Sequence, residues 1–216
     1  MARALVLVVA AGIAAAVLVG WSGGVPGGPR CAVTVAGGAE LLAGPPEEVT
    51  SAVSRALDGP RRSALRSALG SGPALSCQIR AIPVSDTPKE PPLGLTPRAQ
   101  ELRAQVRAAH GRIPDGGFGP EQTLPGRRAS GEHSRGRAID FFFRPHADPG
   151  QARAGWELAN WAVAHAQRLG IRTVIYRDRI WTARRSAQGW RDYRFAGPDP
   201  NDPVNRHLDH VHIDVG

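Results

Sequence analysis

Two stretches of this chain alternate polar and apolar residues around an aspartate. The first covers residues 137–143 and the second residues 210–215. A period of two is typical of β-strands, in which successive side chains point to opposite faces. Asp140 on the first strand needs a partner, because an unpaired buried carboxylate costs several kcal/mol. We therefore expect the two strands to lie side by side, sharing an apolar face made of Ile139, Phe141, Phe143, Val211, Ile213 and Val215.

Periodicity predicts the remaining elements as well. Thr96 and Pro97 provide an N-cap and a first helical residue, and glycines at 111 and 170 provide helix stops. Residues 113–130 and 189–206 lack periodicity and are expected to be loops, the first forming a wall of a binding cleft that leads to His133. The expected helices cover 46–57, 61–69, 97–110 and 152–169, and the other strands cover 31–35, 76–82, 171–176 and 179–182.

These elements divide the chain into four segments. Residues 1–30 form an apolar N-terminal segment, and residues 31–82 form a small β-α-α-β domain without histidine or an acid cluster. Residues 83–95 are rich in proline and predict a semi-extended linker. Residues 96–216 contain both alternating strands, so the chemistry of the protein is expected in this last segment.

The N-terminal segment determines the expected compartment. Arg3 precedes an uncharged run over residues 4–21, which exceeds the ~7–15 residues of a usual signal-peptide core. The run, without a clear cleavage site, favours an uncleaved membrane anchor over a signal peptide, and both alternatives stay open. We expect the rest of the chain to be secreted or held at the outer face of the cytoplasmic membrane, which it contacts only through this segment.

The chain contains two cysteines, Cys31 and Cys77. An oxidising compartment outside the cytoplasm favours a disulfide between them over two buried free thiols.

The net charge of +8 raises the question of nucleic-acid binding. The basic residues are almost all arginines, with Lys89 as the one lysine, and they are scattered along the chain. No basic stripe with aromatic residues and no nucleic-acid motif accompanies them. We therefore expect no nucleic-acid partner, whereas a cationic surface suits an anionic cell wall or membrane.

The two alternating strands carry the residue types of a metal site. His133 and Asp140 lie seven residues apart, and His212 occupies the polar face of the second strand. Zinc favours histidine nitrogen and carboxylate oxygen, and a catalytic zinc keeps three protein ligands and one open position. The alternative is that the histidines at 207, 210 and 212 form the solvated end of an edge strand. Histidines and aspartates occur together in or next to both alternating stretches, which favours a zinc site made of His133, Asp140 and His212.

Other polar residues suggest roles around that site. Asp209, three residues before His212, is a candidate general base, and His210 can donate to an oxyanion. Arginine binds carboxylates in a bidentate manner, so the substrate-binding candidates are Arg127, Arg128 and Arg135.

These motifs resemble the D-Ala-D-Ala metallopeptidase superfamily, whose pattern is Ser-x-His-x6-Asp followed by Glu/Asp-x-x-His. Gly131-Glu132-His133 with Asp140 matches the first half, with Gly131 in place of serine, and residues 209–212 match the second. The resemblance covers residues 97–216. It implies an α+β fold with a small antiparallel sheet flanked by helices, zinc on His133, Asp140 and His212, Asp209 as base, and His210 as transition-state stabiliser. The arginine in a Tyr-Arg context that active members carry has no clear counterpart.

Two functions follow as hypotheses. The first is a zinc-dependent peptidase that cleaves peptides of peptidoglycan, like a D,D-carboxypeptidase or an endopeptidase. The second is a zinc-stabilised module that binds the cell wall without catalysis, since fold alone does not decide function.

Overall fold

The computed structural model describes residues 29–35, 37–58, 64–84, 94–118 and 131–216. Most of the N-terminal segment and most of the linker lie outside these residues, as do Arg127 and Arg128. Within the described part of the chain, no helix has the length and apolar character needed to cross a bilayer.

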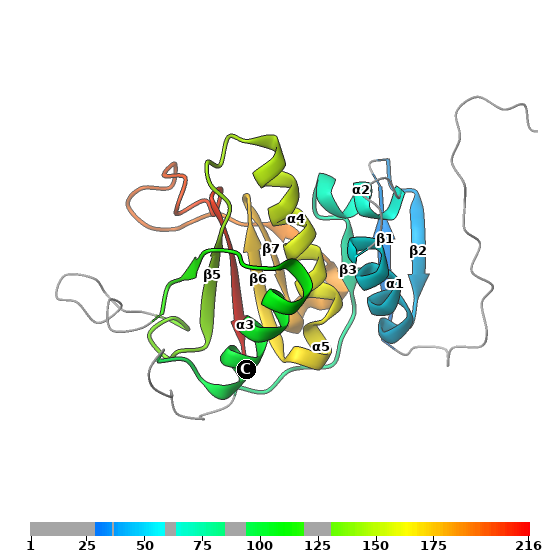
Figure 1. The fold of residues 1–216 in the computed structure, drawn as a ribbon, viewed down its shortest axis with the longest axis horizontal. Coiled ribbons are helices and arrows are strands. Elements are labelled where there is room, and N and C mark those ends of the chain that lie inside the picture. Colours follow the sequence, from blue (N-terminus) through cyan, green and yellow to red (C-terminus); the bar gives the residue numbers. More distant parts are fainter. Residues whose placement is uncertain (1–28, 36, 59–63, 85–93, 119–130) are drawn as a thin grey trace, which may run out of the picture.

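A six-stranded antiparallel sheet forms the centre of the C-terminal part (Figure 1). Its middle strand, β9, pairs with β5 on one side and β6 on the other, and α helices flank the sheet, which confirms the expected α+β class. The two-residue strands β4 and β8 lie inside segments predicted as loops. In sheet order the strands are β4 (Asp115–Gly116), β5 (Ala138–Phe142), β9 (His210–Val215), β6 (Ile171–Tyr176), β7 (Arg179–Thr182) and β8 (Arg191–Asp192).

Three helices cover one face of this sheet: α3 (Pro97–His110), α4 (Pro149–Ala164) and α5 (Ala166–Leu169). Thr96 caps α3 as expected, its side chain accepting a hydrogen bond from the Ala99 amide. The covered face is fully buried and includes Ile139, Phe141, Val174, Trp181, Val211 and Ile213. The opposite face therefore remains available for chemistry.

The helix predicted over 152–169 begins earlier and is broken near its end. Asp148 caps the first turn, with Pro149 at the first helical position. At His165 the backbone leaves the helical conformation, and the imidazole stacks on Trp161 with ring centroids 4.1 Å apart. Gly170 adopts the left-handed conformation that ends α5, as expected.

The N-terminal part is a three-stranded sheet with two helices rather than the predicted β-α-α-β unit. Strand β2 was missed because its first residues are exposed and do not alternate. The strand predicted over 76–82 is also shorter, ending at Cys77. The elements are β1 (Cys31–Thr34), β2 (Glu40–Gly44), α1 (Pro46–Asp58), α2 (Ala64–Ser71) and β3 (Leu75–Cys77), with strand order β2-β1-β3.

The predicted disulfide between Cys31 and Cys77 is present. The two cysteines lie directly opposite each other on β1 and β3, and both are buried. The bond joins residues 46 apart in sequence, and closing such a loop stabilises by about 4 kcal/mol in the chain-entropy view.

Helix α4 connects the two sheets through one buried amide. The side chain of Asn160 accepts a hydrogen bond from the Leu75 amide at 2.9 Å. It donates to the carbonyl oxygens of Leu69 at 2.7 Å and Gly72 at 2.8 Å. The Glu157 carboxylate, one turn earlier on α4, pairs with Arg66 at 2.8 Å. The N-terminal elements therefore share a polar and apolar junction with α4.

Candidate metal centre

The pairing of β5 with β9 brings the expected ligands onto one face. The strands are antiparallel, and Asp140 lies directly opposite His212. Phe142 faces His210 and Ala138 faces Asp214 in the same register. Directly opposed residues of a ladder share a face, so the polar sides of both predicted strands form one surface.

His133 reaches this surface from a turn that precedes β5. The Glu132 carbonyl accepts hydrogen bonds from the amides of Arg135 and Arg137. The Glu132 carboxylate also binds the Arg137 guanidinium at 2.5 Å. Burial raises the pKa of Glu132, but the hydrogen bond from Arg137 outweighs it and the pKa is lowered. Glu132 is thus held as an anion that fixes the turn and the position of His133.

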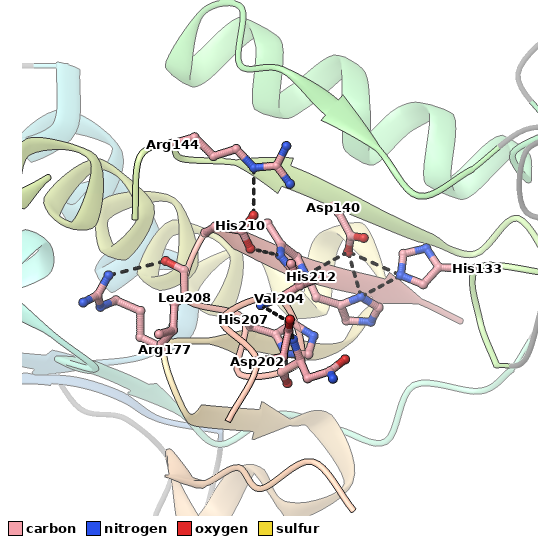
Figure 2. Close-up of polar contacts among 12 residues, drawn as sticks. His133, Asp140, Arg144, Arg177, Asp202, Val204, His207, Leu208, His210 and His212 are labelled. Atoms are coloured by element: carbon pink, nitrogen blue, oxygen red, sulfur yellow. Dashed lines mark hydrogen bonds and ion pairs between the residues drawn. The ribbon is translucent and has the colours of Figure 1, made fainter. Parts of the chain in front are cut away.

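Three atoms from these residues form a compact triangle (Figure 2). His133 Nε2 lies 3.0 Å from His212 Nδ1 and 3.3 Å from Asp140 Oδ1, and His212 Nδ1 lies 3.0 Å from Asp140 Oδ1. Tetrahedral zinc with bonds of about 2.0–2.1 Å separates its ligand atoms by about 3.3 Å. The donor types and spacing of the triangle therefore fit a metal ion.

The electrostatics of the triangle favour a positive charge. Burial raises the pKa of Asp140, but hydrogen bonds from His133 and His212 hold that pKa far below its ordinary value. Burial lowers the pKa of His212, but its contacts with Asp140 and Asp214 raise that pKa to about 9. A cation between these groups replaces the proton that they otherwise attract.

Asp214 supports His212 from behind, a role that the sequence analysis did not assign. Its Oδ2 lies 3.7 Å from His212 Nε2, while Oδ1 is buried and has no hydrogen-bond partner among the described residues. Carboxylates commonly orient metal-binding histidines in this way. The sequence feature that could have indicated this role is the position of Asp214, two residues after His212 and therefore on the same face of the strand.

Asp209 is not part of the triangle. It contacts the ring of His210, and that ring in turn lies near Asp140. Asp209 Oδ1 lies 2.8 Å from His210 Nδ1, and Arg144 Nε donates to Asp209 Oδ2 at 2.7 Å. The second ring nitrogen of His210 lies 3.8 Å from Asp140 Oδ1. Burial raises the pKa of Asp209, but hydrogen bonds from His210 and Arg144 lower it. Arg144 was not anticipated, since it follows β5 without any motif.

Of the three arginines predicted to bind substrate, Arg135 alone lies among the described residues. Arg135 places its guanidinium on Glu132 at 3.2 Å, and its side chain is 60% exposed. Arg127 and Arg128 lie outside the described residues.

His207 covers the site from the segment that leads to β9. Its ring centroid lies 4.7 Å from that of His210 and 5.7 Å from that of His212, and Tyr193 packs on its other side at 4.9 Å. Burial, followed by the two neighbouring histidines, lowers the pKa of His207 to about 3. A neutral imidazole thus forms one wall of the site.

Gly117 lies against His133 and Asp140. We expect its replacement by alanine to weaken metal binding by about 10–100-fold, the cost of disturbing the surroundings of a metal ligand. A Cβ atom there would lie 2.7 Å from His133 Cε1 and 2.8 Å from Asp140 Oδ2. The two ligands would have to move apart. The measurement is zinc affinity by competition with a chelator.

Gly111→Ala is the matched control for Gly117→Ala. Gly111 has φ +74 and Gly117 has φ +79, but a Cβ at Gly111 would meet no atom within 4 Å. The control carries the same backbone strain and should keep wild-type zinc affinity. Equal loss of affinity in both variants would attribute the effect to strain and contradict the steric explanation.

Comparison with known proteins identifies a family that matches this chain. The family model for the VldE C-terminal domain matches residues 92–206, more than half of the 216-residue chain. The match contains His133 and Asp140 but ends before β9, so His212 lies beyond it. No curated protein and no solved structure shows a significant match to the chain. The chain belongs to the VldE family, which it matches through that family's C-terminal domain.

Proposed function

We propose that this protein is a zinc-dependent hydrolase of cell-wall peptides and a member of the D-Ala-D-Ala metallopeptidase superfamily. The supporting observation is the triangle of His133, Asp140 and His212 with ligand atoms 3.0–3.3 Å apart. Two histidines and one carboxylate are a common ligand set of catalytic zinc in peptidases. The motif spacing of residues 131–140 and 209–212 is that of this superfamily.

The residues around the triangle are suited to proton transfer. When bound, zinc lowers the pKa of a coordinated water to about 7. His210 directs one ring nitrogen at the ligand side of Asp140 and the other at Asp209, so it can accept or donate a proton at the reacting group. Asp209 and Arg144 fix the orientation of His210. We therefore assign proton transfer to the His210–Asp209 pair rather than to Asp209 alone.

The proposed substrate is a peptide of peptidoglycan. The net charge of +8 favours contact with an anionic wall, and the N-terminal apolar segment favours export. The disulfide is consistent with an oxidising compartment outside the cytoplasm.

Digestion of purified peptidoglycan fragments by the full chain tests the proposal. We expect the zinc-loaded protein to release amino acids or shortened peptides, detected by mass spectrometry, and the chelator-treated protein to release none. His210→Gln should lower kcat by about 100-fold or more, the usual contribution of a general acid or base. His146→Gln is the control, because His146 lies outside the site, and it should keep full activity. No cleavage by the zinc-loaded wild type would reject the hydrolase.

One observation favours the second candidate, a cell-wall binding module without catalysis. Both carboxylate oxygens of Asp209 are engaged, by Arg144 and by His210, and its pKa is lowered. A carboxylate held in this way is a weak base. Binding of zinc-loaded protein to insoluble peptidoglycan without any product release would support this candidate over the first.

A further inference from the structure

The sheet register extends the metal face toward a second site. Asp140 is opposite His212, His212 opposite Ile175, Ile175 opposite Ile180, and Ile180 opposite Arg191. These five residues therefore form a row across five strands, on the face away from the helices. With strands about 4.8 Å apart, Arg191 lies about 14 Å from His212.

A pocket of 440 Å³ lies at the Arg191 end of this row. Thr173, Ile180 and Thr182 form its floor on β6 and β7. The 3₁₀ helix η2 (Ala183–Gln188) and the segment after β3 form its walls. Ser186 connects these two walls by hydrogen bonds. Its Oγ accepts one from the Ile79 amide at 3.1 Å and donates one to the Ile79 carbonyl at 3.4 Å. The pocket is thus built by fixed elements.

The pocket is strongly cationic. Among the described residues that line it none is acidic, and four are arginines: Arg172, Arg184, Arg185 and Arg191.

In the described part of the chain, none of these four arginines forms an ion pair with a carboxylate, although the charge of Arg172 helps to lower the pKa of Glu132. Arg191 donates to the Thr182 hydroxyl at 2.8 Å, but its Nε is buried without a hydrogen-bond partner among the described residues. Burial, followed by the charge of Arg185, lowers the pKa of Arg191. The partly buried charge of Arg191, next to the exposed Arg184 and Arg185, is costly unless an anion compensates it.

We propose that this pocket binds a carboxylate side group of the peptide whose scissile bond lies at the metal. Arginine clusters bind carboxylates with charge-assisted, bidentate hydrogen bonds. An extended peptide spans about 3.3–3.6 Å per residue, so 14 Å corresponds to about four residues. Between the two sites, Ile180 is partly exposed and offers an apolar contact for the intervening chain, whereas Ile175 is buried. This inference rests on the proposed function, because it places an acidic residue about four positions from the cleaved bond.

The test compares two peptides, acetyl-Glu-Gly-Gly-D-Ala-D-Ala and the same peptide with Gln in place of Glu. Titration calorimetry on zinc-free full-length protein measures binding without cleavage. We expect the Glu peptide to bind at least about tenfold more tightly. The double variant Arg184→Gln/Arg185→Gln should reduce this ratio to about one.

The double variant Arg55→Gln/Arg153→Gln is the matched control. It removes the same charge from exposed positions on α1 and α4 and should keep the preference for Glu. Thermal unfolding of both double variants checks that they fold like the wild type.

Three outcomes would overturn the inference: equal binding of the two peptides, no binding of either, or a Glu preference that survives in the Arg184→Gln/Arg185→Gln protein. A Glu preference in binding, with no hydrolysis by the zinc-loaded protein, would instead reject the hydrolase and keep the carboxylate site. The two failures are therefore distinguishable.

Discussion

Replacing His212 with alanine is expected to reduce the zinc content of the purified protein from about one ion per chain to almost none. The variant leaves two of the three candidate ligands, His133 and Asp140, and removes one of the two histidine partners of the Asp140 carboxylate. Loss of a ligand should cost more than the roughly 100-fold that loss of a ligand's hydrogen-bonding neighbour costs. Elemental analysis of the full chain, after dialysis against zinc and then against buffer, measures the effect.

The thermal stability of the same proteins gives a second readout. Zinc at 100 times its dissociation constant stabilises a protein that binds it only in the folded state by about 2.7 kcal/mol. The wild type should therefore unfold at a higher temperature with zinc, whereas His212→Ala should not respond. His146→Ala, the same substitution outside the triangle, should behave like the wild type. Wild-type zinc content in His212→Ala would exclude the triangle as the metal site.

Replacing Asn160 with alanine is expected to lower the free energy of unfolding by about 4 kcal/mol. The change leaves the buried Leu75 amide without its acceptor and removes the donor to Leu69 and Gly72. Unsatisfied buried polar groups cost about 1–3 kcal/mol each, and the shortened side chain leaves a cavity. The large expected effect reflects the position of Asn160, which lies on α4 and forms hydrogen bonds with Leu69 on α2 and Leu75 on β3.

Urea denaturation of wild type and variant, followed by tryptophan fluorescence with the disulfide intact, measures this difference. Asn201→Ala is the control, because Asn201 is exposed, and surface changes of this kind stay within about 0.5 kcal/mol. A loss below 1 kcal/mol in Asn160→Ala would contradict this role, because it would show that the hydrogen bonds of the Asn160 amide contribute little to stability.

The metal triangle could be anticipated because its signals are local. Alternation around Asp140 and His212 predicted two strands with one polar face each. Pairing of the two strands brings these residues together, since directly opposed residues share a face. Strands β6 and β7 were predicted with their observed bounds, because their apolar runs end at a tight turn. The disulfide could be predicted because the chain has two cysteines and the expected compartment is oxidising.

Features that depend on long-range contacts could not be anticipated. Arg144 and Asp209 lie 65 residues apart and meet only because β5 and β9 are neighbours. The arginine pocket combines residues from β6, η2 and β8, whose shared face depends on the register of three strand pairs. Strand β2 lacks the alternation that marks a half-buried strand, so nothing local distinguished it from a loop.

The central place of β9 has a consequence for biosynthesis. Strands β5 and β6 are joined to each other only through β9, which follows them in the chain. A ribosome that proceeds from the N-terminus makes both neighbours before the strand that unites them. A nascent chain that stops before His210 lacks both the strand that unites the sheet and His212, so the candidate metal centre can form only after β9 has been made.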